Sequence, residues 1–129
     1  MAVYLTKLFN KKAKKLKITT DTLLKAASEV MNGVFEADLG GDVIKKRVPL
    51  KGMGKSGGTR TIIFFKSGTN LFFFDGWSKS EVSGKGAKEI EDDDLEGYKD
   101  VAAELLKYDD KKIKKMLELK LLVEVKDEH

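Results

Sequence analysis

The sequence feature that most restricts the fold is a pair of apolar runs, Arg60–Lys66 and Asn70–Trp77, joined by the turn sequence Ser67–Asn70. Aromatic and β-branched residues dominate both runs, and such residues favour strands. A short junction that contains Gly and Asn between two such runs predicts a β-hairpin. Because each run is apolar on both of its faces, we expect two central strands that are covered on at least one side.

Hydrophobic spacing elsewhere predicts helices on both sides of this hairpin. The expected elements are a short strand at Val3–Leu5, a basic amphipathic helix at Lys7–Leu16, a helix capped within Thr19–Thr22, a turn around Gly40 and Gly41, a strand at Val43–Val48, the hairpin, a helix that begins at Glu91, a helix capped by Asp109 and Asp110, and a last strand at Leu121–Val125. This order predicts an α+β domain, in which two N-terminal helices and the C-terminal helices pack on an antiparallel sheet of about four to five strands. The length of 129 residues predicts one domain over residues 1–129.

A cationic segment, Val43–Arg60, precedes and enters the hairpin, and it contains no Asp or Glu. Its basic residues are Lys45, Lys46, Arg47, Lys51, Lys55 and Arg60. Glycines and a serine between residues 52 and 58 predict a loop, and a cation-rich loop held by strands suits a phosphodiester. On a period of two, Ile44 and Val48 should share one face of a strand, while Lys45 and Arg47 share the other.

The overall charge supports a polyanionic partner for the first two thirds of the chain. Residues 1–90 hold 17 Lys or Arg against 8 Asp or Glu, a net charge of +9, whereas residues 91–129 carry −5. A basic body beside an acidic tail section indicates that the body binds an anion such as nucleic acid. Scattered lysines that only keep the surface soluble are the alternative interpretation.

Residue types that are absent exclude several kinds of site. The sequence has no Cys, and its single His is the terminal His129. Disulfides, thiolate metal sites, multi-His metal sites and a Ser-His-Asp triad are therefore excluded, and we expect no metal and no cofactor. No apolar run approaches the length of a membrane span, and the chain lacks a signal-peptide core, so we expect a cytoplasmic protein with no membrane partner.

One nucleotide-binding motif can be set aside. Gly54-Lys55-Ser56 resembles the end of a P-loop, but that motif needs a Gly where this chain has Pro49. It also needs a helix afterwards, whereas an apolar strand follows here. The sequence therefore predicts no nucleotide cofactor.

Cleavage or binding of RNA agrees better with these residues. RNA carries its own nucleophile, the 2′-hydroxyl, so a protein need only align that group, stabilise the charge on the phosphoryl oxygens and help the proton transfers. Arg offers bidentate contact, and Lys offers a movable charge whose pKa neighbouring cations can lower. Arg60 is the first candidate because it stands where the glycine-rich segment enters an apolar strand. Solvated lysines or a passive RNA-binding face remain the alternative.

Three motifs resemble a known family. K-R-V-P…G-x-G-K-S-G-G-x-R-T-I-I-F-F lies at residues 46–65, F-F-F-x-G-W-S-K-S-E at 72–81 and D-D-D-L-E-G-Y-K at 92–99. Together they resemble the RelE/HigB superfamily of toxins from toxin–antitoxin systems, most closely its HigB-like branch. The resemblance implies a RelE-like α+β fold with a curved antiparallel sheet. It also implies an mRNA endonuclease that acts on the translating ribosome and is neutralised by a cognate antitoxin, often a helix-turn-helix protein.

The resemblance also implies site residues. Those implied to contact and stabilise the scissile phosphate are Arg60, Lys55 and Arg47, and Lys79 stands where the superfamily places another functional basic residue of the catalytic set. Those implied or suggested for RNA contact are Lys45, Lys46, Lys51, Gly57, Gly58 and, as a stacking platform, Trp77 or Phe74. Tyr98 falls on the inward stripe of its helix, so we expect it in the core rather than on the RNA, and the general acid and base stay unassigned.

Two other functions remain open at this level. A non-catalytic RNA- or DNA-binding module, or an inactive remnant of a toxin, would carry the same basic residues. A gyrase-inhibiting toxin would share the fold, but this type generally lacks the basic set of Arg47, Lys55, Arg60 and Lys79.

Overall fold

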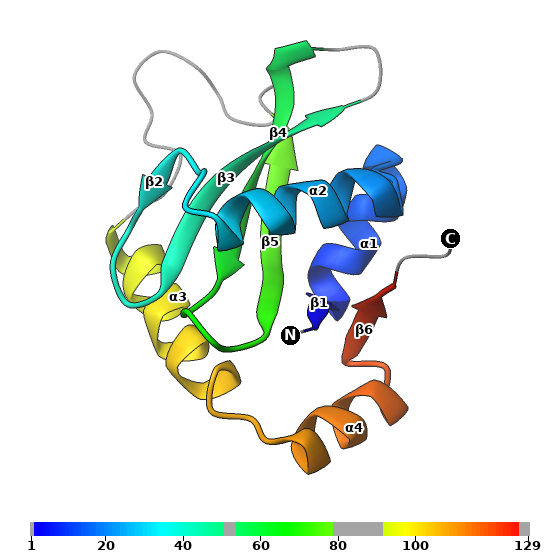
Figure 1. Cartoon of the computed structure of the whole chain (residues 1–129), viewed down its shortest axis with the longest axis vertical. Helices are drawn as coiled ribbons and strands as arrows, with labels where there is room; N and C mark the ends of the chain where they lie inside the picture. The colour runs from blue at the N-terminus through cyan, green and yellow to red at the C-terminus, as the bar shows by residue number, and fades with distance from the viewer. Residues whose placement is uncertain (1, 51–53, 79–91, 127–129) are drawn as a thin grey trace.

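The computed structural model describes residues 2–50, 54–78 and 92–126, with backbone alone for residues 54–57 and 92–93. The elements are β1 (Val3–Thr6), α1 (Lys7–Leu16), α2 (Thr20–Met31), β2 (Ala37–Asp38), β3 (Val43–Leu50), β4 (Gly54–Phe64), β5 (Leu71–Ser78), α3 (Asp92–Leu105), α4 (Asp110–Glu118) and β6 (Leu122–Val125). The α+β class is confirmed, and so is the β4–β5 hairpin (Figure 1). Among the described residues no helix is both long enough and apolar enough to cross a membrane.

The described strands form one sheet in the order β2-β3-β4-β5-β1-β6. The prediction of a wholly antiparallel sheet is wrong, because β1 pairs with β5 in parallel through Val3↔Leu71 and Leu5↔Phe73. The reason lies in the route of the chain, since α1 and α2 carry it from β1 towards the opposite edge of the sheet. From there β3, β4 and β5 return as an antiparallel meander, so that β5 runs in the same direction as β1.

The sheet has six described strands, more than expected, because the short β2 pairs with β3 through Ala37↔Lys45 and Asp38↔Ile44. The sequence predicts only a turn in that region. The turn itself is confirmed, since Gly40 and Gly41 have φ angles of 86° and 60°. Side chains disfavour this left-handed conformation, which glycine adopts without strain.

Two hydrophobic clusters cover the two faces of the sheet, as the apolar runs predict. On one face α1 and α2 pack against Ile44, Val48 and Ile63, and Figure 1 shows α2 crossing in front of the central strands. On the other face α3 and α4 belong to one hydrophobic cluster with Ile62 and Phe64. We call these the α1/α2 face and the α3/α4 face.

Helix boundaries follow the capping residues of the sequence. The hydroxyl of Thr19 accepts a hydrogen bond from the Thr22 N–H, and the carboxylate of Asp109 accepts one from the Lys112 N–H, so both predicted caps are confirmed. Such caps satisfy N–H groups that the first turn of a helix leaves free.

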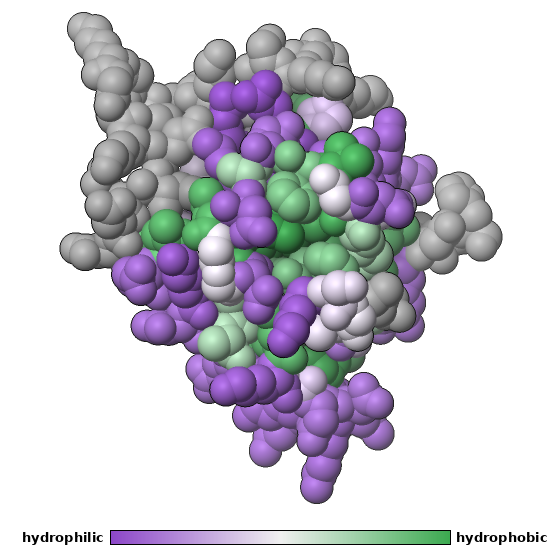
Figure 2. All heavy atoms as spheres, turned by 60° about the vertical axis from the view of Figure 1, so that its left-hand side comes forward, coloured by the Kyte–Doolittle hydropathy of each residue, from purple (hydrophilic) through white to green (hydrophobic). Residues whose placement is uncertain are grey.

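Figure 2 shows hydrophilic residues around a central apolar area, in agreement with a charged content of 36%.

Candidate active site

The structure aligns three of the predicted site residues in a row across the central strands. Arg47 on β3 is paired with Arg60 on β4, and Arg60 is paired with Trp77 on β5. Directly opposed residues of antiparallel strands point to the same face, with their Cβ atoms about 4.5–5.5 Å apart. The row Arg47–Arg60–Trp77 therefore lies on the α3/α4 face, and Lys45, two residues before Arg47, shares that face as predicted.

This row is unusually buried for its polarity. Arg60 is only 6% exposed, and Trp77 packs beside the α3/α4 cluster. The Arg47 Nε and the Trp77 Nε1 are buried and find no hydrogen-bond partner among the described residues. A buried donor without an acceptor costs about 1–3 kcal/mol. Such donors are accordingly rare in folded proteins and mark places where a ligand can complete the bonding.

Two guanidinium groups on directly opposed positions also repel each other. Like charges at such positions destabilise a sheet by a few tenths of a kcal/mol, up to about 1 kcal/mol. An anion placed between Arg47 and Arg60 would relieve this repulsion, and a phosphate accepts from both guanidinium groups in the bidentate geometry that Arg favours. The arrangement therefore suits a phosphodiester.

The glycine-rich segment differs from its prediction. We expected a loop over residues 52–58, but β4 begins at Gly54, which pairs with Leu50. The register jumps from Val48↔Thr59 to Leu50↔Gly54, so that residues 55–58 stand opposite the single Pro49. Pro has no N–H for the ladder, and an irregularity of this kind is where sheets tolerate it.

Gly58 is required by this irregularity. A Cβ atom at Gly58 would lie 2.5 Å from the carbonyl oxygen of Val48, which is far inside contact distance. Gly58 therefore lets β4 approach the backbone of β3 closely, and the contact with RNA expected at this glycine stays a prediction. Gly57 and Lys55 lie on the same stretch of β4, with their side chains outside the described part, and Lys51 and Lys79 lie outside the described residues.

Lys46 lies apart from the other candidates. Its position on β3 places it on the α1/α2 face between Ile44 and Val48, where the residue is 5% exposed. The Nζ donates to the Val34 carbonyl oxygen at 3.1 Å and lies 3.2 Å from the Glu29 Oε1. This burial on the α1/α2 face separates Lys46 from the row on the α3/α4 face, and its contact with RNA stays a prediction.

The aromatic candidates pack against the core. Phe74 stacks on Phe64 with ring centroids 4.7 Å apart, and Tyr98 meets Phe74 edge-on at 5.5 Å. Burial, with the nearby carboxylates of Asp75 and Asp94, raises the pKa of Tyr98 to about 12. The expected core position of Tyr98 is confirmed, and at neutral pH its hydroxyl stays protonated.

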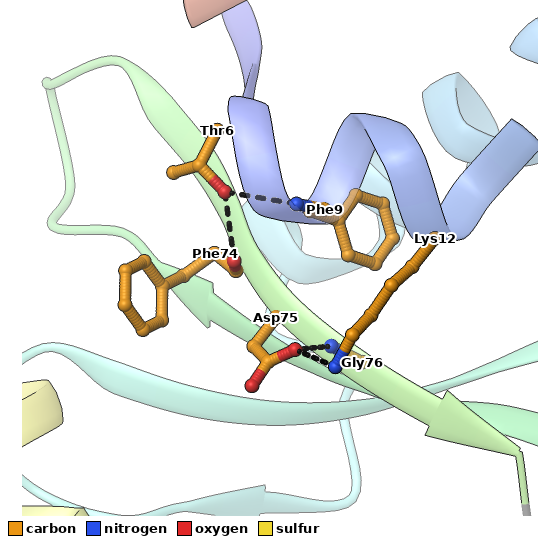
Figure 3. A network of polar contacts seen from close by, with 6 residues as sticks. All are labelled: Thr6, Phe9, Lys12, Phe74, Asp75 and Gly76. Carbon is orange, nitrogen blue, oxygen red and sulfur yellow. Dashed lines mark hydrogen bonds and ion pairs between the residues drawn. The ribbon is translucent and has the colours of Figure 1, made fainter. Parts of the chain in front are cut away.

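A network that sequence reasoning missed holds the strand that bears Trp77 (Figure 3). The ladder between β1 and β5 ends at Phe73, and beyond it the Thr6 hydroxyl donates to the Phe74 carbonyl oxygen at 2.8 Å. The Asp75 Oδ1 then accepts from the Lys12 Nζ at 2.6 Å and from the Gly76 N–H at 2.7 Å. The only sign of this network in the sequence is Asp75, a single carboxylate within the apolar run of β5. Thr6 at the end of β1 and Lys12 on α1 thus hold the last part of β5, where no pairing with β1 is present among the described residues.

Among the described residues no group of three or more His, Asp or Glu side chains is placed to hold a metal ion.

In comparisons with known proteins, a family model described as "RelE toxin of RelE / RelB toxin-antitoxin system" matches residues 1–125. A search of curated proteins found no match. The matched segment includes every described element and the whole row of site residues.

Proposed function

The chain belongs to the RelE toxin family, and from this premise we propose that it is a metal-independent endonuclease that cuts mRNA on the translating ribosome. The family supports a toxin that acts as an endoribonuclease. The placement of Arg47 directly opposite Arg60, beside Trp77, is the observation that carries the proposal for this chain.

Arg47 and Arg60 can together supply the charge stabilisation that cleavage of RNA requires. The 2′-hydroxyl of the substrate loses its proton and attacks the adjacent phosphorus, while the bond from phosphorus to the 5′-oxygen breaks and that oxygen takes up a proton. Negative charge grows on the phosphoryl oxygens during this exchange. Arg47 and Arg60, both fixed by strand pairing, stabilise that charge and cost no reorganisation when the reaction occurs. Trp77 lies next to Arg60 and presents an aromatic surface to a base. In the proposal Lys55 and Lys79 complete the catalytic set, Lys45 and Lys51 hold the RNA backbone, and Gly57 and Gly58 let it approach.

Partners follow from the same premise. The family implies a cognate antitoxin of the RelB type and action on mRNA and the ribosome. We propose further that the chain belongs to the HigB-like branch, that its antitoxin contains a helix-turn-helix domain, and that it acts in the cytoplasm. The motif at residues 45–60 supports the branch, because it resembles the K-x-R-x…G-x-G-K-S-G-G-x-R pattern of that branch.

Expression in a bacterial host without antitoxin tests the proposal. The wild type should arrest growth and leave cut mRNA, while Arg60→Ala should relieve both effects, because loss of one charge-stabilising donor costs about 10²–10³ in rate. Lys66→Ala is the matched control, since Lys66 is an exposed cation two residues after the end of the same strand.

The control should be as toxic as the wild type. Equal toxicity of Arg60→Ala would contradict the role of Arg60. A wild type that is folded but leaves growth and transcripts unchanged would favour the alternatives, a binding module or an inactive remnant. Retention of an RNA oligonucleotide by the purified wild type separates those two.

A further inference from the structure

A cavity of about 340 Å³ lies on the other side of the strand that carries Arg47. Its walls come from α2, from the segment that follows α2, and from β3. This volume is within the range of small-ligand pockets, roughly 300–1,000 Å³. Arg47 belongs both to its lining and to the catalytic row, so the cavity adjoins the proposed site of cleavage.

The cavity offers hydrogen-bond donors and acceptors side by side. Lys46 lines it with a side chain that is 6% exposed. Its ammonium group, which has three N–H donors, donates to the Val34 carbonyl oxygen and forms an ion pair with Glu29. Glu29 contacts Lys46 through Oε1, and Glu36 accepts the Arg47 N–H through Oε1 at 2.6 Å. Among the described residues nothing donates to the Oε2 of either carboxylate, so both can accept from a ligand.

The remaining lining suits the faces of a planar ring. Ala26, Val34 and Pro49 are apolar, and they accompany the charged groups in the wall. A planar apolar body with hydrogen-bonding groups on its edge describes a nucleobase. Lys25 lies at the same cavity and can contact a phosphate.

The outer edge of β3 provides the route from the catalytic row. Among the described residues β2 pairs with β3 only at Ile44 and Lys45, so that no strand covers β3 from Lys46 onwards. A single-stranded RNA whose phosphate sits between Arg47 and Arg60 can therefore pass over this edge and place the neighbouring base in the cavity. Glu36, which binds the Arg47 N–H, stands at this crossing.

We propose that the cavity is a base-binding subsite for the nucleotide next to the scissile phosphate, and that it selects against uracil. This inference rests on the proposed endonuclease function. The carboxylates of Glu29 and Glu36 accept from the amino groups of adenine, cytosine or guanine, and Lys46 donates to a neighbouring ring nitrogen or carbonyl oxygen. Uracil offers one N–H between two carbonyl oxygens, and those oxygens repel the carboxylates.

Purified protein with programmed ribosomes tests the subsite. Messages that differ only in the base on each side of the cut are compared for cutting rate. The wild type should cut messages with uracil at one of these positions about tenfold more slowly, the effect of one lost base contact. Glu36→Gln should reduce this difference to about twofold, because an amide can also donate to a carbonyl oxygen of uracil.

A variant whose side chain fills the cavity provides a second, independent test of the subsite. Val34 is 53% exposed and lines the cavity, so Val34→Trp should occupy the cavity without disturbing the core, and should abolish base discrimination. Leu119→Trp is the matched control, since Leu119 is 57% exposed and lies outside the cavity lining, and it should keep the wild-type preference. Thermal unfolding confirms that each variant is folded.

The outcomes separate the two proposals. Failure of the folded wild type to cut any message would refute the endonuclease function, and the subsite with it. Cutting of every message at rates within about twofold would overturn the subsite and leave the endonuclease function intact. If folded Val34→Trp and Glu36→Gln both retain the wild-type base preference, the subsite is likewise overturned and the endonuclease function stands.

Discussion

Substitution of Gly76 by Ala provides a sharp test of how β5 is held against α1 and β4. Gly76 is buried on β5 and pairs with Thr61, next to the pair of Arg60 and Trp77. A Cβ atom there would lie 2.9 Å from the Phe9 Cε1 and 3.0 Å from the Arg60 carbonyl oxygen. Ordinary contacts of a Cβ begin near 3.4 Å, so a neighbour must move by about half an ångström.

Neither neighbour can move freely. Phe9 is 1% exposed and stacks on Phe73 at 5.2 Å, and the Arg60 oxygen belongs to the backbone of a central strand. Overpacking of this kind costs about 1–3 kcal/mol, of which the reduced entropy of the unfolded Ala chain recovers about 0.4–1 kcal/mol. We therefore expect the free energy of unfolding to fall by about 1–2 kcal/mol for Gly76→Ala.

Thermal unfolding converts this loss into a measurable shift. An unfolding entropy of about 2.1 cal/mol/K per residue gives about 0.27 kcal/mol/K for 129 residues, so that Tm should fall by about 4–8 °C. Gly97→Ala is the matched control, because Gly97 is exposed inside α3 and a Cβ there would meet nothing within 4 Å. Since Ala is better than Gly in a helix by about 0.5–1 kcal/mol, its Tm should rise by about 2–4 °C. A Tm for Gly76→Ala at or above that of the wild type would refute the reasoning.

Two further outcomes are expected from the neighbouring groups. In a double-mutant cycle of Lys12→Met and Asp75→Asn, followed by urea unfolding, the two changes should couple by about 0.5–1 kcal/mol, because the 2.6 Å ion pair is partly buried. Additive losses would show that the pair contributes nothing. Between pH 10 and about 12 the unfolded chain loses the Tyr98 proton while the folded protein keeps it, so stability should fall as pH rises through this window. Tyr98→Phe should show a smaller fall in urea midpoint over the same range, and equal slopes for the two proteins would contradict the raised pKa of Tyr98.

Local signals in the sequence were sufficient for most of the elements. The bounds of α1, the caps Thr19 and Asp109 and the β4–β5 hairpin follow from spacing and capping chemistry that act within a few residues. Alternation along β3 likewise separates Arg47 from Val48, because successive side chains of a strand point to opposite faces.

Local sequence patterns could not predict the register of the strands or the pairing of strands that lie far apart in the chain. The parallel pairing of β1 with β5 joins segments that are far apart in the sequence, and no local pattern specifies it. The two irregularities of the sheet, opposite Pro49 and at Phe74, also shift which residues face each other. These features depend on how both hydrophobic clusters close around the sheet, which is a property of the whole domain.

The same division applies to the candidate site. The sequence by itself determined which cations gather between residues 43 and 60, the face that Arg47 shares with Lys45, and the resemblance to RelE toxins, which the family match to residues 1–125 supports. Only the tertiary structure decided that Arg47 stands opposite Arg60, that Lys46 turns into the α1/α2 face, and that α1 holds β5 through Lys12 and Asp75. Composition and periodicity act along the chain, whereas the distance between two charges depends on a register that the packing of both faces sets.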